Sequence, residues 1–366
     1  MFRAPPGDAP MHVPRGKRLT MPSFSCRVRV LAVALVFLAA EARASVGITE
    51  IPAKDNYGPV TVFYGSSSAS QTVQRGPFAF DLAPEGAPIR GNRRLVVISH
   101  GSGGSPWVHA DLARMLVEAG FVVAMPEHHA DNYKDASAPG PDSWKRRPAE
   151  VSHAIDAVAQ DPRFGPLLEL DKVGMYGVSA GGHTALTLAG GRWSPAQLKR
   201  HCDDHIADDF QTCVGLAARL SGGPFDGIKK TVAQWVIAGK FRDANWYTYS
   251  DPRIVAVVAG VPFAADFDPA SFASPPIPLG IVTAGQDKWL IPRFHSDVVL
   301  QACPSCERVA DFPTGGHGAL LSPLPPGLSG LLGDLLNDPP GFDRAEVPEA
   351  NRKITAFFQK HLIDER

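Results

Sequence analysis

The feature that most constrains the fold of this chain is the repeated alternation of short apolar runs with segments of helical periodicity. The expected strands are 59–65, 76–83, 93–100, 121–128, 172–178, 253–262, 278–285 and 308–313. The expected helices are 107–120, 149–160, 181–190 and 351–362. Strands that are apolar throughout and separated by helices form a parallel sheet covered on both faces. We therefore expect an α/β fold with a mostly parallel central sheet, whose first two strands form an antiparallel start.

The segment 191–250 interrupts this alternation. It is polar, and it carries two irregular helical patterns at 194–202 and 228–241. Ligands of open α/β sheets bind beyond the carboxyl ends of the strands. We expect the segment to be a helical insertion that caps this rim, so that residues 45–366 form one domain.

Residues 1–44 have the pattern of an export signal. Arginines precede a ten-residue apolar run at 31–40, and the tripeptide 42–44 has the small-x-small pattern of a cleavage site. This order is typical of a secretory signal peptide. The run is shorter than the roughly 20 residues that a membrane span needs, so we expect no stable membrane span. Residues 1–20 resemble an over-extended start, because a signal peptide of normal length would begin at Met21.

Cleavage near Ala44 would leave a mildly acidic protein in the periplasm or outside the cell. The whole chain has 36 Lys and Arg against 37 Asp and Glu. Residues 1–44 contain seven of these basic residues and two of the acidic ones, which leaves 29 against 35 and a net charge of −6. A protein of this charge is not expected to bind nucleic acid or an anionic membrane surface.

Four cysteines remain after the predicted cleavage: Cys202, Cys213, Cys303 and Cys306. An even number in an oxidising compartment predicts two disulfides, most simply Cys202–Cys213 and Cys303–Cys306. The alternative is a zinc site, because the second pair has C-x2-C spacing. We favour disulfides because of the expected compartment.

A possible nucleophile lies in the pentapeptide 177–181, which fits G-x-S-x-G with Ser179 at its centre. In a chain with 35 glycines among 366 residues, such a match carries little weight alone. Its context carries more, because an expected strand precedes it and an expected helix follows it. In that setting the serine sits on a sharp turn, and glycines flank it because larger side chains would collide. We therefore predict that Ser179 is a catalytic nucleophile.

A serine hydroxyl needs a base to remove its proton. His317 lies in a glycine-rich loop after the last expected strand, and Asp287 directly follows the expected strand before it. The order serine, acid, histidine along the chain is the one found when the motif lies on a strand–turn–helix. We expect His317 to be the base and Asp287 to orient it, with Asp266 and Asp268 as rival acids that could instead be turn residues or helix caps.

The glycine-rich loop 101–105 follows the expected strand 93–100 and lies on the same rim. Its backbone N–H groups can bind an oxyanion, and we expect the pair of donors to be the N–H groups of Ser102 and Ala180. A phosphate cradle is the alternative, but no G-K-[ST] follows the glycines.

At these residues the chain resembles a known family. The segments that carry the resemblance, in order, are 96–106, 121–132, 146–190, 251–262 and 285–289. They are similar to serine hydrolases of the α/β-hydrolase fold, in the branch that resembles dienelactone hydrolase and platelet-activating-factor acetylhydrolase. The resemblance covers about residues 50–362 and implies the same Asp287 and His317 assignments. Dienelactone hydrolases have cysteine where this chain has Ser179, which favours ester hydrolysis. The resemblance implies short acyl chains, and phospholipid-type, aryl and polymer esters remain open alternatives.

Other side chains on the same loops are candidates for lining the substrate pocket. Trp107, Phe263 and Trp289 flank the catalytic loops, although aromatic core packing is the alternative. The loop 128–131 could bind a metal through its two histidines and its aspartate. The resemblance implies a loop of this kind without metal, so we expect His128 to line the pocket and no metal to bind.

Three further residues have structural interpretations. His183 falls on the helix after the serine and is expected to pack against a neighbouring loop. Arg147 and Pro148 are expected to begin a helix, with the proline in its first turn.

Together these features predict an exported serine esterase that cleaves small carboxylic esters with Ser179, His317 and Asp287 and needs no cofactor. Two alternatives from other classes remain open. A non-catalytic binding protein on a hydrolase scaffold is expected to lack a catalytic residue. A peptidase of related fold is expected to need a large gating domain. A metal-dependent hydrolase is the weakest alternative.

Overall fold

The computed structural model describes residues 45–363, together with the single positions 11 and 16. The predicted signal peptide, residues 1–44, lies outside this described part apart from those two positions. From residue 45 onward the described residues belong to one compact unit, which includes the segment 191–250. No helix in this described part is long and apolar enough to cross a membrane.

The centre of the structure is a ten-stranded sheet in the order β10-β9-β8-β7-β5-β6-β2-β1-β4-β3. The strands are β1 Ser45–Ile51, β2 Val60–Ser66, β3 Gln71–Arg75, β4 Phe78–Pro84, β5 Leu95–Ser99, β6 Val122–Pro126, β7 Val173–Val178, β8 Ile254–Gly260, β9 Leu279–Ala284 and β10 Glu307–Phe312. From β6 to β10 all neighbouring strands run parallel. β2 pairs antiparallel with both β1 and β6. The predicted, mostly parallel sheet is therefore confirmed. The two strands expected at its start, β2 and β4, are not neighbours: β1 lies between them, antiparallel to β2 and parallel to β4.

Helices cover both faces of this sheet. The α-helices are α1 Ala110–Glu118, α2 Pro141–Gln160, α3 Ala180–Leu188, α4 Pro195–His205, α5 Phe210–Val214, α6 Asp226–Lys240, α7 Ser296–Ala302, α8 Gly330–Leu336 and α9 Val347–Leu362. Successive side chains of a strand point to opposite faces, so Leu95 packs on the face of α2 and α3 while Val96 packs on the face of α1 and α9. Burial on both faces explains why the strands read as continuous apolar runs.

One predicted helix boundary is wrong. The sequence suggested that a helix begins at Arg147 and Pro148, but α2 begins at Pro141, and Pro148 lies inside the helix. Pro141 itself occupies the first turn, where a missing N–H costs nothing. Gly140 precedes it with a φ of 92°, a left-handed conformation that favours glycine. The second proline is therefore an internal one, and Arg147 faces the protein interior.

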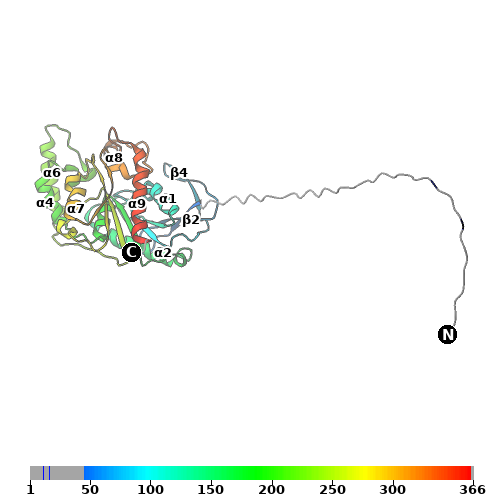
Figure 1. The fold of residues 1–366 in the computed structure, drawn as a ribbon. Helices are drawn as coiled ribbons and strands as arrows, with labels where there is room; N and C mark the ends of the chain where they lie inside the picture. Colours follow the sequence, from blue (N-terminus) through cyan, green and yellow to red (C-terminus); the bar gives the residue numbers. More distant parts are fainter. Residues whose placement is uncertain (1–10, 12–15, 17–44, 364–366) are drawn as a thin grey trace. The chain divides into compact units, whose positions relative to one another are not determined.

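The segment 191–250 contains α4, α5 and α6. α4 and α6 match the two irregular helical patterns that were expected, and α5 was not expected. A disulfide between Cys202 and Cys213 joins α4 to α5, and α6 packs against both of these helices. Figure 1 shows α4 and α6 at the end of the molecule away from β2 and β4. The second predicted disulfide, Cys303–Cys306, is also present. Both cysteine pairs are therefore confirmed.

Candidate active site

Ser179 occupies the sharp turn between β7 and α3. Its backbone has φ 58° and ψ −116°, a strained combination for a residue with a side chain. The flanking glycines are required by close backbone contacts: a Cβ on Gly177 would lie 2.0 Å from the Gly181 carbonyl oxygen, and a Cβ on Gly181 would lie 2.0 Å from the Ser99 carbonyl oxygen. The turn therefore depends on the glycine positions of the motif.

Two hydrogen-bonding contacts connect Ser179 to His317 and Asp287. His317 Nε2 lies 3.0 Å from Ser179 Oγ, and His317 Nδ1 lies 2.7 Å from Asp287 Oδ2. The other carboxylate oxygen of Asp287 accepts hydrogen bonds from the backbone N–H groups of Trp289 (2.8 Å) and Leu290 (2.9 Å). These two donors fix the orientation of the carboxylate, so that Oδ2 stays directed at the imidazole of His317. The structure thus brings together the three residues that the sequence singled out.

The rival acids have other partners. Asp266 is fully buried, and its Oδ2 lies 3.1 Å from Nε2 of His183. His183 stacks on Trp144, with ring centroids 5.1 Å apart, so its expected packing role fits the structure. Asp268 accepts a hydrogen bond from the Ala270 N–H (3.1 Å) and caps a short helix. Neither carboxylate contacts His317.

The glycine-rich loop after β5 passes directly beside Ser179. A Cβ on Gly101 would lie 3.9 Å from Ser179 Oγ, so the backbone of this loop borders the space above the hydroxyl. Ala180 is the first residue of α3, where a backbone N–H has no acceptor within the helix. Ser102 and Ala180 therefore come from two segments that flank the nucleophile, and both line the same cavity as Ser179.

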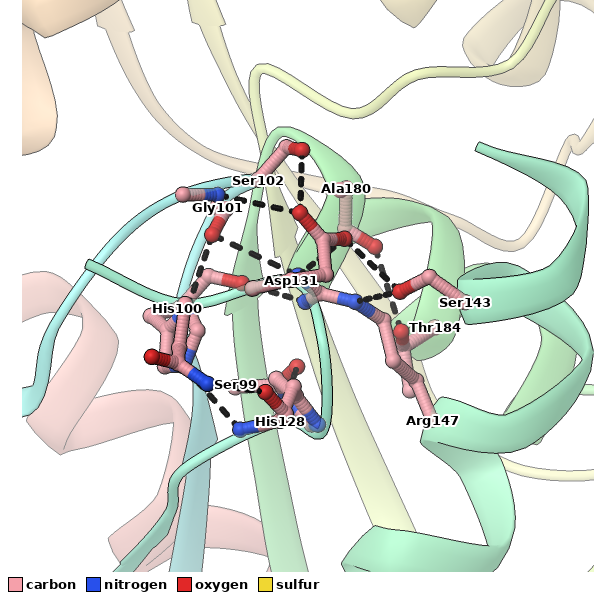
Figure 2. A network of polar contacts seen from close by, with 12 residues as sticks. Ser99, His100, Gly101, Ser102, His128, Asp131, Ser143, Arg147, Ala180 and Thr184 are labelled. Carbon is pink, nitrogen blue, oxygen red and sulfur yellow. Dashed lines mark hydrogen bonds and ion pairs between the residues drawn. The ribbon is translucent and has the colours of Figure 1, made fainter. Parts of the chain in front are cut away.

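A buried ion pair supports the glycine-rich loop from below (Figure 2). Arg147 and Asp131 are both fully buried, and Arg147 Nη2 lies 2.8 Å from Asp131 Oδ2. Arg147 also donates to the carbonyl oxygens of His100 (2.6 Å) and Gly101 (3.4 Å). Arginine suits this position because its planar fork can serve several acceptors at once.

Asp131 lies between Arg147 and the glycine-rich loop and binds both (Figure 2). Its Oδ1 accepts hydrogen bonds from the Ser102 hydroxyl (2.5 Å) and from the Gly103 N–H (3.1 Å), and its Oδ2 accepts one from Ser143 (2.7 Å). Burial pushes the pKa of this carboxyl up, but the charge of Arg147 and these hydrogen bonds outweigh burial and hold the pKa below its usual value. Asp131 is therefore a charged anchor for the loop, a role that sequence reasoning missed.

His128 lies under the same loop rather than on the pocket wall. Its Nε2 is 2.7 Å from Ser99 Oγ, and its Nδ1 is 2.5 Å from Glu150 Oε2. Burial, with the nearby charge of Arg147, lowers the pKa of His128 well below its usual value. The imidazole is therefore neutral at pH 7, and its contact with Glu150 is a hydrogen bond.

The suggested metal site in the loop 128–131 is not assembled. Asp131 binds Arg147, His128 binds Glu150, and the exposed His129 contacts Arg146. Within residues 45–363, no group of three or more His, Cys, Asp or Glu side chains is placed to hold a metal ion.

A large cavity opens from Ser179 and His317 toward the segment 191–250. It has a volume of about 1460 Å³, and its walls come mainly from apolar residues of α5, α6 and α8 and of the loops around them. Of the four side chains expected at the pocket, Phe263 and Trp289 line this cavity. His128 is buried below it, and Trp107 lies elsewhere, with the guanidinium of Arg75 5.4 Å from the centre of its ring.

A polar cluster fastens α5 to the loop that follows Asp287. The hydroxyl of Thr212 donates to the Trp289 carbonyl oxygen (3.1 Å) and lies 2.9 Å from His295 Nε2. Asp209 lies 2.7 Å from His201 and 3.4 Å from His295. Burial pushes the pKa of Asp209 up, but hydrogen bonds from the two histidines outweigh it and lower the pKa to about 2. The cavity wall is thus tied directly to the segment that carries Asp287.

Comparisons by sequence give no relative: no protein-family model matches the chain, and no curated protein matches it. By structure the chain is similar to a ferulic acid esterase from Streptomyces cinnamoneus, with a TM-score of 0.56 and 15% sequence identity. The alignment covers 89% of this chain and 92% of the esterase. Similarity at this level of identity establishes the fold, and the predicted α/β-hydrolase fold is confirmed; its branch within that fold stays a prediction.

Proposed function

We propose that this chain is a serine hydrolase that cleaves carboxylic esters through an acyl-enzyme. The observation that carries the proposal is the series of hydrogen-bonding contacts from Asp287 through His317 to Ser179, at the edge of a mainly apolar cavity. A nucleophile, a base within hydrogen-bonding reach and a group that orients the base are the parts that acyl transfer requires.

The first half-reaction forms the acyl-enzyme. Ser179 Oγ attacks the ester carbonyl carbon, and His317 Nε2 accepts the hydroxyl proton. The imidazolium that forms is stabilised by Asp287, which holds the Nδ1–H. When the tetrahedral intermediate collapses, the C–O bond to the alcohol breaks, and His317 gives its proton to the leaving oxygen.

The second half-reaction releases the acid. His317 removes a proton from water, whose oxygen attacks the acyl carbon, and Ser179 leaves with the proton returned by His317. In both halves the N–H groups of Ser102 and Ala180 stabilise the negative oxygen. The fixed support of the loop by Arg147 and Asp131 favours this role, because donors that need no reorganisation stabilise developing charge best. These steps require no cofactor.

Export and a capping role of the segment 191–250 complete the proposal. Disulfides such as Cys202–Cys213 and Cys303–Cys306 persist in oxidising compartments, which fits removal of a signal peptide near Ala44 and a periplasmic or extracellular location. The residues of α5 and α6 that line the cavity beside Ser179 fit a cap over the site.

The test is a reaction of the purified protein with a fluorophosphonate probe, followed by mapping of the labelled residue and by rate measurements with p-nitrophenyl esters. We expect the adduct on Ser179, and we expect Ser179→Ala to lower kcat by about a thousandfold or more. Ser67→Ala is the matched control, because this exposed serine lies at the end of β2.

Turnover by Ser179→Ala at the wild-type rate would refute the proposal. A folded protein without adduct and without ester hydrolysis would favour the binding-protein alternative. Cleavage of peptide amides at rates above those of esters would favour the peptidase alternative.

A further inference from the structure

The cavity beside Ser179 is much larger than a short acyl group needs. Its volume of about 1460 Å³ exceeds the roughly 300–1,000 Å³ of most small-molecule sites. At roughly 30 Å³ for each heavy atom, the share of one molecule in liquid water, the five heavy atoms of a four-carbon acyl group fill about a tenth of it. A chain of twelve or more carbons still leaves room for the alcohol portion.

The chemistry of the walls matches a hydrocarbon chain. On one side α6 contributes Val232, Val236 and Ile237, and on the other α8 contributes Leu332, Leu335 and Leu336. Among the described residues that line the cavity, the Lys, Arg, Asp and Glu side chains are three lysines, Lys229 and Lys240 of α6 and Lys134 of the loop after β6. Walls that are mainly apolar bind by burial of apolar area, which grows with the length of the chain.

The mouth of the cavity continues into an exposed apolar surface. Ile228, Val232 and Trp235 are spaced at i, i+4 and i+7 along α6, so they share one face of the helix. Their exposed fractions are 61%, 53% and 78%, and Phe225, just before the helix, is 69% exposed. Ile228 and Val232 also line the cavity. Monomeric proteins rarely expose clustered large apolar side chains without a binding role.

We propose that the substrate is an ester with a long apolar acyl chain of about ten carbons or more, taken from an aggregated, lipid-like phase. This inference rests on the proposed function, because it assigns the substrate of the same site. The ester carbonyl lies at Ser179, and the acyl chain lies between α6 and α8. The exposed face of α6 contacts the aggregate from which the chain enters the cavity. The short acyl chains expected from the sequence resemblance would leave most of the cavity empty.

The first test compares monomeric p-nitrophenyl esters from acetate to dodecanoate below their aggregation concentrations. Each buried methylene can strengthen binding by up to about fourfold, so we expect kcat/KM to rise at least tenfold between butanoate and dodecanoate. A maximum at four carbons or fewer, with Ser179-dependent hydrolysis intact, would overturn this inference and leave the proposed function standing. Absence of any hydrolysis or fluorophosphonate adduct would instead overturn the proposed function.

The second test fills the cavity. Ala218 lines its wall, and Ala218→Trp should lower the ratio of kcat/KM for dodecanoate to that for butanoate by at least tenfold. The control is Ala244→Trp, the same change at an exposed position of the segment 191–250 away from the cavity wall. An unchanged ratio in folded Ala218→Trp would contradict the placement of the acyl chain.

The third test addresses the exposed face of α6. With p-nitrophenyl dodecanoate in mixed detergent micelles, we expect Trp235→Ser to lower the rate at least fivefold. Trp246→Ser is the control, because Trp246 is also exposed, at 42%, but lies against Arg192 outside α6. Equal rates for the two variants would show that the face of α6 does not contact the aggregated substrate.

Discussion

The two sides of Ser179 are built from opposite kinds of residue. Below the glycine-rich loop, Arg147, Asp131 and His128 are fully buried polar groups, and each has several hydrogen-bonding partners (Figure 2). Across the nucleophile, the cavity is bounded by α6 and α8 with apolar side chains that reach the surface. The polar side is suited to holding backbone donors at fixed positions, and the apolar side is suited to binding.

The two sides also differ in how they are anchored. Arg147 alone contacts three segments, through Ser143 of its own helix, His100 of the glycine-rich loop and Asp131. In the segment 191–250, the Cys202–Cys213 disulfide joins α4 to α5, and the cluster around Thr212 joins α5 to the loop after Asp287. Removing one side chain should therefore lower the unfolding free energy far more on the polar side of Ser179 than on the apolar side.

The largest expected effect comes from Arg147→Met. The change leaves Asp131 as an unpaired buried charge, and breaking such a pair costs about 3–5 kcal/mol of unfolding free energy. Because the glycine-rich loop loses its support, kcat should also fall while KM for a short ester changes little. Chemical denaturation and steady-state kinetics measure the two effects.

Two companion variants sharpen this prediction. Arg147→Lys keeps the charge but loses the planar fork, so its stability and kcat should lie between those of the wild type and Arg147→Met. The double variant Asp131→Asn with Arg147→Met removes both charges and should recover part of the stability. If Arg147→Met lowers the unfolding free energy by less than about 1 kcal/mol, the contribution of an exposed ion pair, then the buried pair anchors the loop no better than a surface ion pair would.

The next effect concerns the anchor of the segment 191–250. The Cys202–Cys213 disulfide closes a loop with a sequence separation of 11, and the Cys303–Cys306 disulfide one with a separation of 3. In the chain-entropy account, replacing the first pair by serines lowers the unfolding free energy by about 3 kcal/mol, and replacing the second pair by about 2 kcal/mol. Thermal and denaturant unfolding measure the difference.

Activity separates the two disulfide variants further. Loss of Cys202–Cys213 should lower the hydrolysis of long esters more than that of short ones, because the disulfide holds a wall of the cavity. Equal effects of the two double variants on both kinds of ester would contradict the view that the Cys202–Cys213 disulfide holds a wall of the cavity.

A smaller effect appears in the pH dependence of stability. His109 is buried, and burial lowers its pKa from 6.5 to about 4. Between these two values the unfolded chain binds a proton that the folded chain does not, so this group stabilises the fold above pH 6.5, and its contribution is lost as the pH falls toward 4. Burial lowers the pKa values of His100 and His128 as well, so these groups add to the same pH dependence of the unfolding free energy. Burial raises the pKa of Glu150, so the contribution of Glu150 to stability changes with pH in the opposite direction.

His109→Leu isolates one of these groups. Near pH 5 the variant should reduce the slope of unfolding free energy against pH by up to about 1.4 kcal/mol per pH unit, the value for one proton. Denaturant unfolding at several pH values measures the slope. An unchanged slope would show that His109 exchanges protons equally in both states.

The sequence was most informative where a local pattern decides the structure. Apolar runs buried on both faces predicted the strands of the parallel sheet, and the order Ser179, Asp287, His317 along those strands predicted which side chains would meet. Two strands, β1 and β3, were missed. β3 lies at the edge of the sheet, where exposed polar side chains interrupt the apolar pattern. β1 lies between β2 and β4, and its glycine, threonine and glutamate interrupt the apolar run.

The supporting network could not be predicted in the same way. Arg147 and Asp131 meet through tertiary contacts that no spacing rule describes, and the internal Pro148 was mistaken for a helix start. A helix that begins at Pro141 with a second proline inside it is the less common arrangement. The cavity could not be predicted either, because its walls come from α6, which was expected only as an irregular helical pattern, and from α5 and α8, which were not expected.

The smallest expected effect on stability is that of Trp235→Ser. Its side chain is 78% exposed, so the substitution should change the unfolding free energy by no more than about 0.5 kcal/mol. Trp193→Ser provides the contrast, because Trp193 is 1% exposed and its loss should cost about 3–5 kcal/mol. If Trp235→Ser destabilised the protein by more than about 1 kcal/mol in a concentration-dependent way, the face of α6 would be covered by a second copy in solution. A stable Trp235→Ser with a specific defect on micellar esters would instead mean that this surface serves the substrate rather than the fold.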